Sequence, residues 1–374
     1  MEAKRILVVA RWPVGGIRTY FRYTYGQDCF KQYQITFLMP NLGNIKDYLT
    51  MICASPNTEF VEVGDSGKNL FFGVRNHLSE ETYDLIHSHG YSAGVLTSLA
   101  CQFAKVKEHL MTAHDVFLNT QFNGLTGVLK RFSMRLAFGK IPYIHAVSFD
   151  CRDNFIEFFP NVSKRTITVI EHGIDAQRFY ESDMRNYGTE LDVENKFLVG
   201  FFGRFMAQKG FKYLVDSVEQ LVTKDPSLKS RLRVLTFGWG GFVREEFEAI
   251  SERGLSEVFI QMPHTDDMPS AIKGLDVVVM PSLWEACGLL GMEVLVAGVP
   301  IIGTSCIGLR EVLSGSPAYV AEPRNSGDIA SFLLQEMKHS RKDLFLDYSH
   351  TALARFSNKR SAQELYKLYA QLIG

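Results

Sequence analysis

The segment that decides the fold reads Val277-Val278-Val279-Met280-Pro281-Ser282-Leu283-Trp284-Glu285-Ala286-Cys287-Gly288-Leu289-Leu290-Gly291-Met292-Glu293. Its first four residues are apolar, which is typical of a strand buried on both faces of a parallel sheet. Gly288 gives an open backbone, and an apolar helix is expected from about Leu289. A turn from a strand into a helix exposes backbone N–H groups, which favours an anion at the helix N-terminus. The segment therefore predicts an α/β unit with an anion site.

Two carboxylates belong to this segment. Glu285 is expected in the loop and Glu293 in the helix, so that both can face one cleft. A carboxylate can accept hydrogen bonds from a pair of sugar hydroxyls. The alternative interpretation is a solvated Glu285 and a Glu293 that only favours the helix dipole. Taken alone, the segment leaves both interpretations open.

A second loop carries two cations. The stretch Gly203-Arg204-Phe205-Met206-Ala207-Gln208-Lys209-Gly210 follows an apolar run at 197–202 and precedes a helical pattern. Two cations at the carboxyl end of a strand suit a diphosphate. For a lone Arg or Lys, ordinary surface charge is the better interpretation.

Outward from these loops, apolar runs alternate with helical patterns along the whole chain, which indicates a doubly wound α/β architecture. The expected strands of the first half are 6–10, 35–39, 60–63, 85–87, 110–113, 144–147 and 168–170. Those of the second half are 197–202, 233–237, 258–260, 277–280, 300–303 and 318–320. The fold class is thus α/β, with two Rossmann-like domains in tandem.

The domain boundaries follow from a polar, aperiodic stretch at 179–196, which we interpret as the linker. Residues 1–178 are then the N-terminal domain and 197–355 the C-terminal domain. The last segment, 356–374, is expected to form a helix that crosses back to the N-terminal domain.

The composition limits the class of protein. The chain has 374 residues, a formal net charge of −1 and six cysteines without a C-x-x-C pair. The near-zero charge gives no general attraction to nucleic acid, so no nucleic-acid partner is expected. Dispersed cysteines favour a reducing compartment. No apolar run approaches the ~20 residues of a membrane span. These features predict a cytoplasmic protein.

In their order and spacing, the motifs resemble the family 4 retaining glycosyltransferases of type B fold, which have a Glu-x7-Glu signature. The resemblance covers nearly the whole chain. Its further elements are Gly15-Gly16, Asp84-Leu85-Ile86-His87-Ser88-His89, His114-Asp115, Glu171-His172-Gly173-Ile174-Asp175, Arg310-Glu311-Val312 and Arg355-Phe356-Ser357.

The resemblance implies a retaining, metal-independent transfer of a sugar from a nucleotide-sugar donor, with the donor cleft between the two domains. The N-terminal domain would bind the acceptor, which is an unidentified saccharide or lipid-linked molecule, in glycan or cell-surface polysaccharide synthesis. No resident cofactor is implied, and a UDP-sugar is the leading expectation for the donor substrate.

The resemblance also assigns roles to residues. Arg204 and Lys209 would clamp the donor diphosphate, and Glu285 would hold hydroxyls of the donor sugar. Glu293 would hold the ribose hydroxyls, and His114 would lie near the donor sugar. The remaining donor-binding positions are the backbone groups of Gly15, Gly16, Gly288, Leu289 and Leu290.

Three positions depart from the family pattern. Cys287 stands where the family usually has Phe, and Met262 where it usually has Gly. The segment at 171–175 begins Glu-His rather than Asn. The first two departures concern the shape of the sugar and base pockets and leave the phosphate clamp unaffected.

No metal site is expected. The chain contains no Asp-x-Asp sequence. A metal site at His87, His89 and His114 is the alternative, but no cluster of carboxylates or cysteines accompanies them. Stabilisation of the diphosphate by Arg, Lys and helix dipoles fits better.

The stretch Leu125–Lys140 combines an apolar stripe with basic residues. The favoured interpretation is a helix whose apolar stripe faces the core, with a solvated basic side. The alternative is peripheral contact with an anionic membrane, as expected if the acceptor is a lipid.

Two other functions share these sequence features. One is a sugar-nucleotide epimerase on the same fold, and the other is a non-catalytic partner subunit of a glycosyltransferase. The intact set of Arg204, Lys209, Glu285 and Glu293 weighs against a non-catalytic subunit. A hydrolysis assay on nucleotide sugars would separate these functions.

Overall fold

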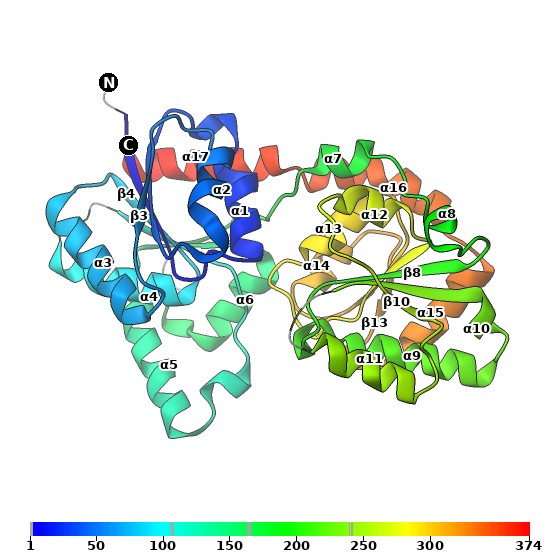
Figure 1. Ribbon diagram of the computed structural model, residues 1–374. Helices are drawn as coiled ribbons and strands as arrows, with labels where there is room; N and C mark the ends of the chain where they lie inside the picture. Colours follow the sequence, from blue (N-terminus) through cyan, green and yellow to red (C-terminus); the bar gives the residue numbers. More distant parts are fainter. Residues whose placement is uncertain (1–2, 105, 107, 163–165, 239, 241) are drawn as a thin grey trace. The chain divides into compact units, whose positions relative to one another are not determined.

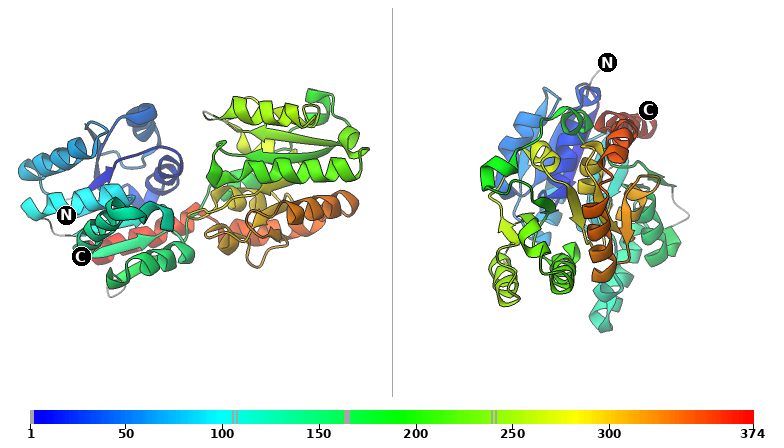
Figure 2. Two further views of the ribbon diagram at one scale, coloured as in Figure 1. Left: turned by 90° about the horizontal axis from the view of Figure 1, so that it is seen from below. Right: turned by 90° about the vertical axis from the view of Figure 1, so that its right-hand side faces the viewer.

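The computed structural model describes residues 3–104, 106, 108–162, 166–238, 240 and 242–374 (Figure 1). The chain forms two compact units, residues 1–173 with 358–374 and residues 174–357. Each unit has a parallel sheet with helices on both faces (Figures 1 and 2). The predicted fold class is therefore confirmed. The chain passes into the second unit at Gly173–Ile174, and the stretch 179–196 lies inside that unit.

The first unit contains seven described strands in the order β3-β2-β1-β4-β5-β6-β7. The strands are β1 (Arg5–Ala10), β2 (Gln34–Met39), β3 (Thr58–Glu62), β4 (Leu85–His89), β5 (His109–Ala113), β6 (Tyr143–Ala146) and β7 (Thr166–Val169). The α-helices are α1 (Gly16–Tyr25), α2 (Ile45–Ile52), α3 (Gly67–Glu80), α4 (Tyr91–Ala100), α5 (Gly124–Phe138), α6 (Phe149–Phe158) and α17 (Asn358–Ile373).

Strand β1 shows why its sequence is continuously apolar. Ile6 and Val8 pack against α1, α2 and α17, whereas Leu7 and Val9 pack against α3 and α4. Successive side chains of a strand point to opposite faces, so a sheet covered on both faces requires apolar residues at every position. The last helix, drawn in red in Figure 1, belongs to this unit and packs along α1.

The second unit contains six described strands in the order β10-β9-β8-β11-β12-β13. The strands are β8 (Phe197–Phe202), β9 (Leu232–Phe237), β10 (Phe259–Gln261), β11 (Val277–Met280), β12 (Ile301–Thr304) and β13 (Tyr319–Ala321). The α-helices are α7 (Ala176–Glu181), α8 (Tyr187–Leu191), α9 (Phe211–Lys224), α10 (Leu228–Arg231), α11 (Val243–Glu252), α12 (Met268–Lys273), α13 (Leu289–Val296), α14 (Leu309–Leu313), α15 (Ser326–Lys338) and α16 (Lys342–Arg355).

The core of the second unit lies between its sheet and the helices α9, α11 and α15. Val199 and Phe201 of β8 contribute to it, together with Leu214 and Val218 of α9 and Leu333 of α15. This packing fixes the start of α9 against the end of β8, and the loop at 203–210 with its two cations lies between them.

Helix α5 corrects one prediction. Its apolar stripe does not face the core, because Leu125 is 90% exposed and Leu129 is 66% exposed. The helix packs instead through Gly127, Ala137 and Phe138, two of them small residues that allow close approach. The favoured interpretation of this helix was therefore wrong, and its apolar stripe lies at the surface.

Candidate functional site

The two loops singled out in the sequence lie side by side in the second unit. The loop at 203–210 follows β8 and the loop at 281–288 follows β11, and these strands are neighbours in the sheet. From this boundary the strand order runs outward to β10 on one side and to β13 on the other. The boundary is therefore a topological switch point, where open α/β sheets bind ligands at the carboxyl ends of the strands.

The two loops are joined through their backbones. The N–H of Leu283 donates to the carbonyl of Gln208 at 2.8 Å. Gln208 in turn donates from Nε2 to the carbonyl of Trp284 at 3.0 Å. Gly210 has a φ of +64°, and a Cβ at this position would lie 1.9 Å from the carbonyl oxygen of Pro281. Only glycine allows the loops to approach this closely.

An ion pair connects the loops through their side chains. The ammonium of Lys209 donates to Oε1 of Glu285 at 2.7 Å, and the hydroxyl of Ser282 donates to the same oxygen at 2.8 Å. Glu285 is only 7% exposed. A buried carboxylate is costly unless it is paired, so these two donors compensate the burial of Glu285 and hold its side chain in one position.

A third loop, after β12, fixes the backbone of Glu285. The N–H of Glu285 donates to the carbonyl of Ile307 at 3.0 Å. A Cβ on Gly308 would lie 2.2 Å from the carbonyl oxygen of Glu285. The residues after β8, β11 and β12 therefore meet at Glu285, which is the most constrained carboxylate of the two motifs.

The N-terminus of α13 lies in the same stretch of chain. Gly288 precedes the helix with a φ of +54°, and the amides of Leu289 and Leu290 belong to its first turn. First-turn amides have no carbonyl partner within their helix, and the helix dipole is positive at this end. Arg204 is exposed in the neighbouring loop. The stretch can therefore bind an anion.

Glu293 lies one turn further along α13, and its side chain is largely but not completely buried. Burial raises the pKa of its carboxyl to about 8, against the opposing effect of Arg178. Glu293 is consequently protonated over part of the neutral range, whereas the carboxylate of Glu285 is paired with the ammonium of Lys209. The two acidic residues of the motif thus occupy different electrostatic environments.

In the first unit, Gly15 and Gly16 follow β1. The switch point of the first sheet lies between β1 and its neighbour β4. Gly15 has a φ of +56° and precedes α1, and a Cβ on Gly15 or Gly16 would meet no atom within 4 Å. The backbone at this turn is therefore open. His114 follows β5, the next strand along, and is partly exposed.

The histidines considered as metal ligands are held by hydrogen bonds to other side chains. His87 contacts Tyr369 and Thr112, and His89 contacts Tyr25 and His114. Within the described ranges, no three His, Cys, Asp or Glu side chains group so as to hold a metal ion. Tyr25 and Tyr369 could not be predicted from any sequence pattern, because one lies in the first helix and the other in the last.

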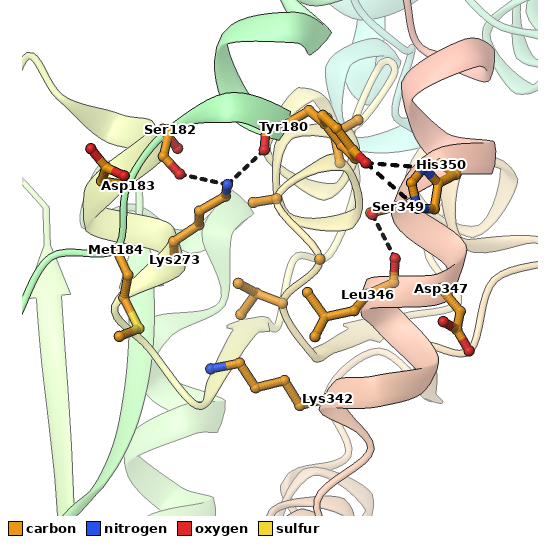
Figure 3. Close-up of a pocket in the computed structure, with 14 residues that line it drawn as sticks. Tyr180, Ser182, Asp183, Met184, Lys273, Lys342, Leu346, Asp347, Ser349 and His350 are labelled. Carbon is orange, nitrogen blue, oxygen red and sulfur yellow. Dashed lines mark hydrogen bonds between the residues drawn. The ribbon is translucent and has the colours of Figure 1, made fainter.

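A separate pocket of about 550 Å³ lies in the second unit, lined by residues of α7, α12, α13 and α16 and of the loops that follow α7 and α13 (Figure 3). Lys273 donates there to the carbonyls of Tyr180 and Ser182, at 2.7 and 2.6 Å. None of the lining residues comes from the loops at 203–210 or 281–288. Lys273 therefore ties the chain after α7 to α12, and this pocket is distinct from the motif loops.

None of the helices in the described part of the chain has both the length and the apolar character that crossing a bilayer requires.

Comparisons with known proteins fit this arrangement. The family described as "Glycosyltransferase Family 4" matches residues 40–178, and "Glycosyl transferases group 1" matches residues 196–339. The lipopolysaccharide core biosynthesis mannosyltransferase LpsB of Rhizobium meliloti (strain 1021) is 32% identical over 40% of this chain and 43% of its own length. The chain thus spans less than half of that relative.

Two further proteins are similar over more of the chain. The Escherichia coli protein named UDP-Gal:alpha-D-GlcNAc-diphosphoundecaprenol alpha-1,3-galactosyltransferase is 24% identical over 74% of each chain. The crystal structure of Anabaena Alr3699/HepE in complex with UDP-glucose shares the fold, with a TM-score of 0.81 at 19% identity over 98% of this chain and 99% of that one. The two family matches occupy both halves of the chain, and the protein belongs to the family 4 glycosyltransferases.

Proposed function

We propose that this glycosyltransferase moves a sugar from a UDP-sugar to a hydroxyl of a saccharide or lipid-linked acceptor, with retention at the anomeric carbon and without a bound metal. The observation that carries the proposal is the Lys209–Glu285 ion pair, which lies beside the N-terminus of α13 at the switch point of the second sheet. The Escherichia coli relative, whose name states a UDP-galactose donor and a lipid-linked acceptor, motivates the choice of UDP and of the acceptor class.

The diphosphate of the donor is bound by Arg204, Lys209 and the first amides of α13. An ammonium has three hydrogens, so the bond from Lys209 to Glu285 leaves others for phosphate oxygens. Glu293 binds the ribose hydroxyls. Gly15 and Gly16 leave the backbone of their own turn in the first unit open.

Glu285 binds hydroxyls of the donor sugar. Its carboxylate is already desolvated and fixed by Lys209 and Ser282, so little reorganisation is needed when the sugar arrives. Its negative charge also stabilises the positive charge that develops on the sugar ring in the transition state.

In the reaction, the bond between the anomeric carbon and the phosphate oxygen breaks, and a bond from the acceptor oxygen to that carbon forms on the same face. The acceptor's proton passes to the departing phosphate oxygen. The negative charge on the leaving diphosphate is stabilised by Arg204, Lys209 and the dipole of α13. An α-linked donor therefore gives an α-linked product.

A transfer assay tests this function. The protein is incubated with α-linked UDP-sugars and acceptor extracts, with and without EDTA, and the product is examined by proton NMR at its anomeric signal. We expect an α-linked product at a rate that EDTA leaves unchanged. A β-linked product, or activity that EDTA abolishes and Mg²⁺ restores, would contradict the mechanism.

We also propose that α5 rests on an anionic membrane surface. Three further apolar residues of its stripe are exposed, namely Val128 (63%), Phe132 (56%) and Leu136 (56%). Lys130, Arg135 and Lys140 are exposed beside them. An exposed apolar stripe with adjacent cations is the pattern of a helix that lies in the interface of an anionic bilayer. A lipid-linked acceptor would be met at such a surface.

Vesicle sedimentation tests the membrane contact. We expect binding to vesicles that contain phosphatidylglycerol, and weak binding to phosphatidylcholine alone. Leu129→Ser with Phe132→Ser should release the protein, and so should Lys130→Glu with Arg135→Glu. Met51→Ser removes a residue that is 74% exposed on α2 and should have no effect. Equal sedimentation of all variants would refute the contact.

A further inference from the structure

A chain of hydrogen-bonded side chains runs through the core of the first unit to His114. It links β4, β5 and β6 with α1 and α17. Its contacts are Ile170 O to His145 Nε2 (3.1 Å), His145 Nδ1 to Thr112 Oγ1 (2.9 Å), Thr112 Oγ1 to His87 Nε2 (2.6 Å), His87 Nδ1 to Tyr369 OH (2.5 Å), Tyr369 OH to Tyr25 OH (3.1 Å), Tyr25 OH to His89 Nε2 (2.9 Å) and His89 Nδ1 to His114 Nε2 (2.9 Å).

The direction of this chain is set at the carbonyl of Ile170, which can only accept. His145 must therefore carry a proton on Nε2. Burial lowers the pKa of His145 to about 4, so the ring is neutral and its Nδ1 is an acceptor. The single hydroxyl proton of Thr112 goes to that nitrogen. The oxygen of Thr112 then accepts the Nε2 proton of His87.

The same assignment of donors and acceptors continues from His87 toward His114. Burial also keeps His87 neutral, with its pKa well below the usual range, so its Nδ1 accepts from the hydroxyl of Tyr369. The oxygen of Tyr369 accepts from Tyr25, and the oxygen of Tyr25 accepts the Nε2 proton of His89. The hydroxyl of Tyr25 also lies 3.1 Å from Nδ1 of His87. If Tyr25 donates there and Tyr369 donates to Tyr25, the direction at His89 is the same.

His89 is therefore left with an unprotonated Nδ1, and it accepts the Nε2 proton of His114. Burial lowers the pKa of both rings, which keeps them neutral. The remaining nitrogen of His114, Nδ1, is an acceptor and bonds to no other described residue. His172 is similar, because its Nδ1 donates to the carbonyl of Gly173 and its buried Nε2 has no partner among the residues that the structure describes. Both rings pack on Tyr20, at 4.7 and 5.1 Å between centroids.

We propose that Thr112, Tyr369, Tyr25 and His89 are positioning residues that hold His114 as a hydrogen-bond acceptor, so that its Nδ1 receives a hydroxyl proton of the bound sugar. This role rests on the proposed function for the sugar contact, but the tautomer itself does not. A nitrogen lone pair repels phosphate and carboxylate oxygens and attracts a hydroxyl. The network therefore favours a hydroxyl group next to Nδ1 of His114. The C-terminal helix α17 contributes to this network through Tyr369.

Nitrogen NMR of histidine-labelled protein tests the tautomer without any ligand. In the wild-type protein, we expect the proton of His114 on Nε2 and an unprotonated Nδ1, with the resonance assigned through His114→Ala. In Tyr25→Phe the donor bond of His89 is lost, and the two tautomers of His114 should both be populated. Tyr33→Phe is the matched control, because Tyr33 packs on Tyr369 and its hydroxyl bonds to no other described residue.

Kinetics test the consequence for the sugar. In Tyr25→Phe and Thr112→Val, kcat/KM should fall about fivefold, which is the value of one hydrogen bond. Thr112→Ser keeps the hydroxyl and should restore the rate, whereas affinity for UDP alone should stay unchanged throughout. In a series of UDP-sugar analogues, one sugar hydroxyl at a time is replaced with fluorine, which cannot donate a hydrogen bond. One analogue should react more slowly than the natural sugar with the wild-type enzyme. With Tyr25→Phe, this analogue should react no more slowly than the natural sugar does.

The outcomes separate the two proposals. A proton on Nδ1 of His114 in the wild-type protein overturns the network, whatever the enzyme does. The expected tautomer together with no activity on any nucleotide sugar overturns the proposed function and leaves the network intact. Unchanged NMR spectra and rates in Tyr25→Phe overturn the positioning role.

Discussion

The ammonium of Lys209 lies 2.7 Å from Oε1 of Glu285 in a partly buried ion pair that joins the loop after β8 to the loop after β11. The two residues are 76 positions apart in the chain. Lys209 neutralises the carboxylate that we assign to the sugar. The residue assigned to the phosphate and the residue assigned to the sugar are thus coupled through this ion pair.

This coupling should be measurable as stability. Lys209→Ala leaves Glu285 buried without its cation, which costs more than the pair contributes. The double variant Lys209→Ala/Glu285→Gln should be more stable than the two single changes predict, with a coupling of about 1 kcal/mol or more. Urea unfolding of the four proteins gives this value. Strictly additive effects would show that the pair is not formed in solution.

Glu285→Gln separates chemistry from binding. The substitution keeps the shape of the side chain but removes the charge that stabilises the positive ring in the transition state. We expect turnover to fall by at least about a hundredfold, while affinity for UDP changes little, since UDP lacks the sugar. Steady-state kinetics and UDP titration provide both numbers, and full turnover in this variant is incompatible with the proposed role.

Glu293 should make stability depend on pH. The pKa of its carboxyl is about 8 in the folded protein against an ordinary 4.5. The folded state therefore holds a proton that the unfolded chain releases, and its stability falls as the pH rises from about 4.5 to 8. Glu293→Gln should remove this penalty and raise the free energy of unfolding by about 2 kcal/mol at pH 8.5. This value is smaller than the full pKa shift implies, because the side chain is partly exposed and solvent screens its charge.

Thermal unfolding at several pH values checks the Glu293 prediction. The variant should melt above the wild type at pH 8.5 and together with it near pH 4.5. Glu252→Gln, an exposed change on α11, serves as the control and should have no such effect. A constant difference across the whole range would show that the carboxyl titrates normally.

Gly210→Ala tests the close approach of the two loops. Its Cβ would lie 1.9 Å from the carbonyl of Pro281, in addition to the cost of a positive φ. Gly315→Ala is the matched control, because Gly315 has a φ of +75° and open space around it. Gly315→Ala should cost about 1–2 kcal/mol from the backbone alone. Gly210→Ala should cost more and also weaken UDP binding, and an equal cost without loss of binding would contradict the geometry.

The sequence predicts the fold well because both sheets are covered on both faces. A central strand such as β1 then reads as a continuous apolar run, Ile6–Ala10, which cannot be confused with a half-exposed strand. The motif loops could also be predicted, because glycine is required where the backbone turns left-handed, as at Gly288. Local sequence therefore accounts for the elements and for the loops that connect them.

The contacts between distant elements could not be predicted in this way. No local pattern indicates that Lys209 pairs with Glu285, because the pairing depends on which strands become neighbours. The same holds for Tyr25 and Tyr369, which meet only because the last helix packs on the first. For α5 the pattern was misleading, since an apolar stripe predicts a buried face equally well whether protein or lipid covers it.

The central claim is that the donor's diphosphate binds at the loops after β8 and β11, and calorimetric titration with UDP tests it most directly. The wild-type protein should bind UDP in preference to GDP, ADP and CDP. Arg204→Ala and Lys209→Ala should each weaken binding at least about tenfold, the value of one charge-assisted hydrogen bond. Lys212→Ala, an exposed change on α9, should bind as the wild type does. Wild-type affinity for UDP in both Arg204→Ala and Lys209→Ala would contradict the account.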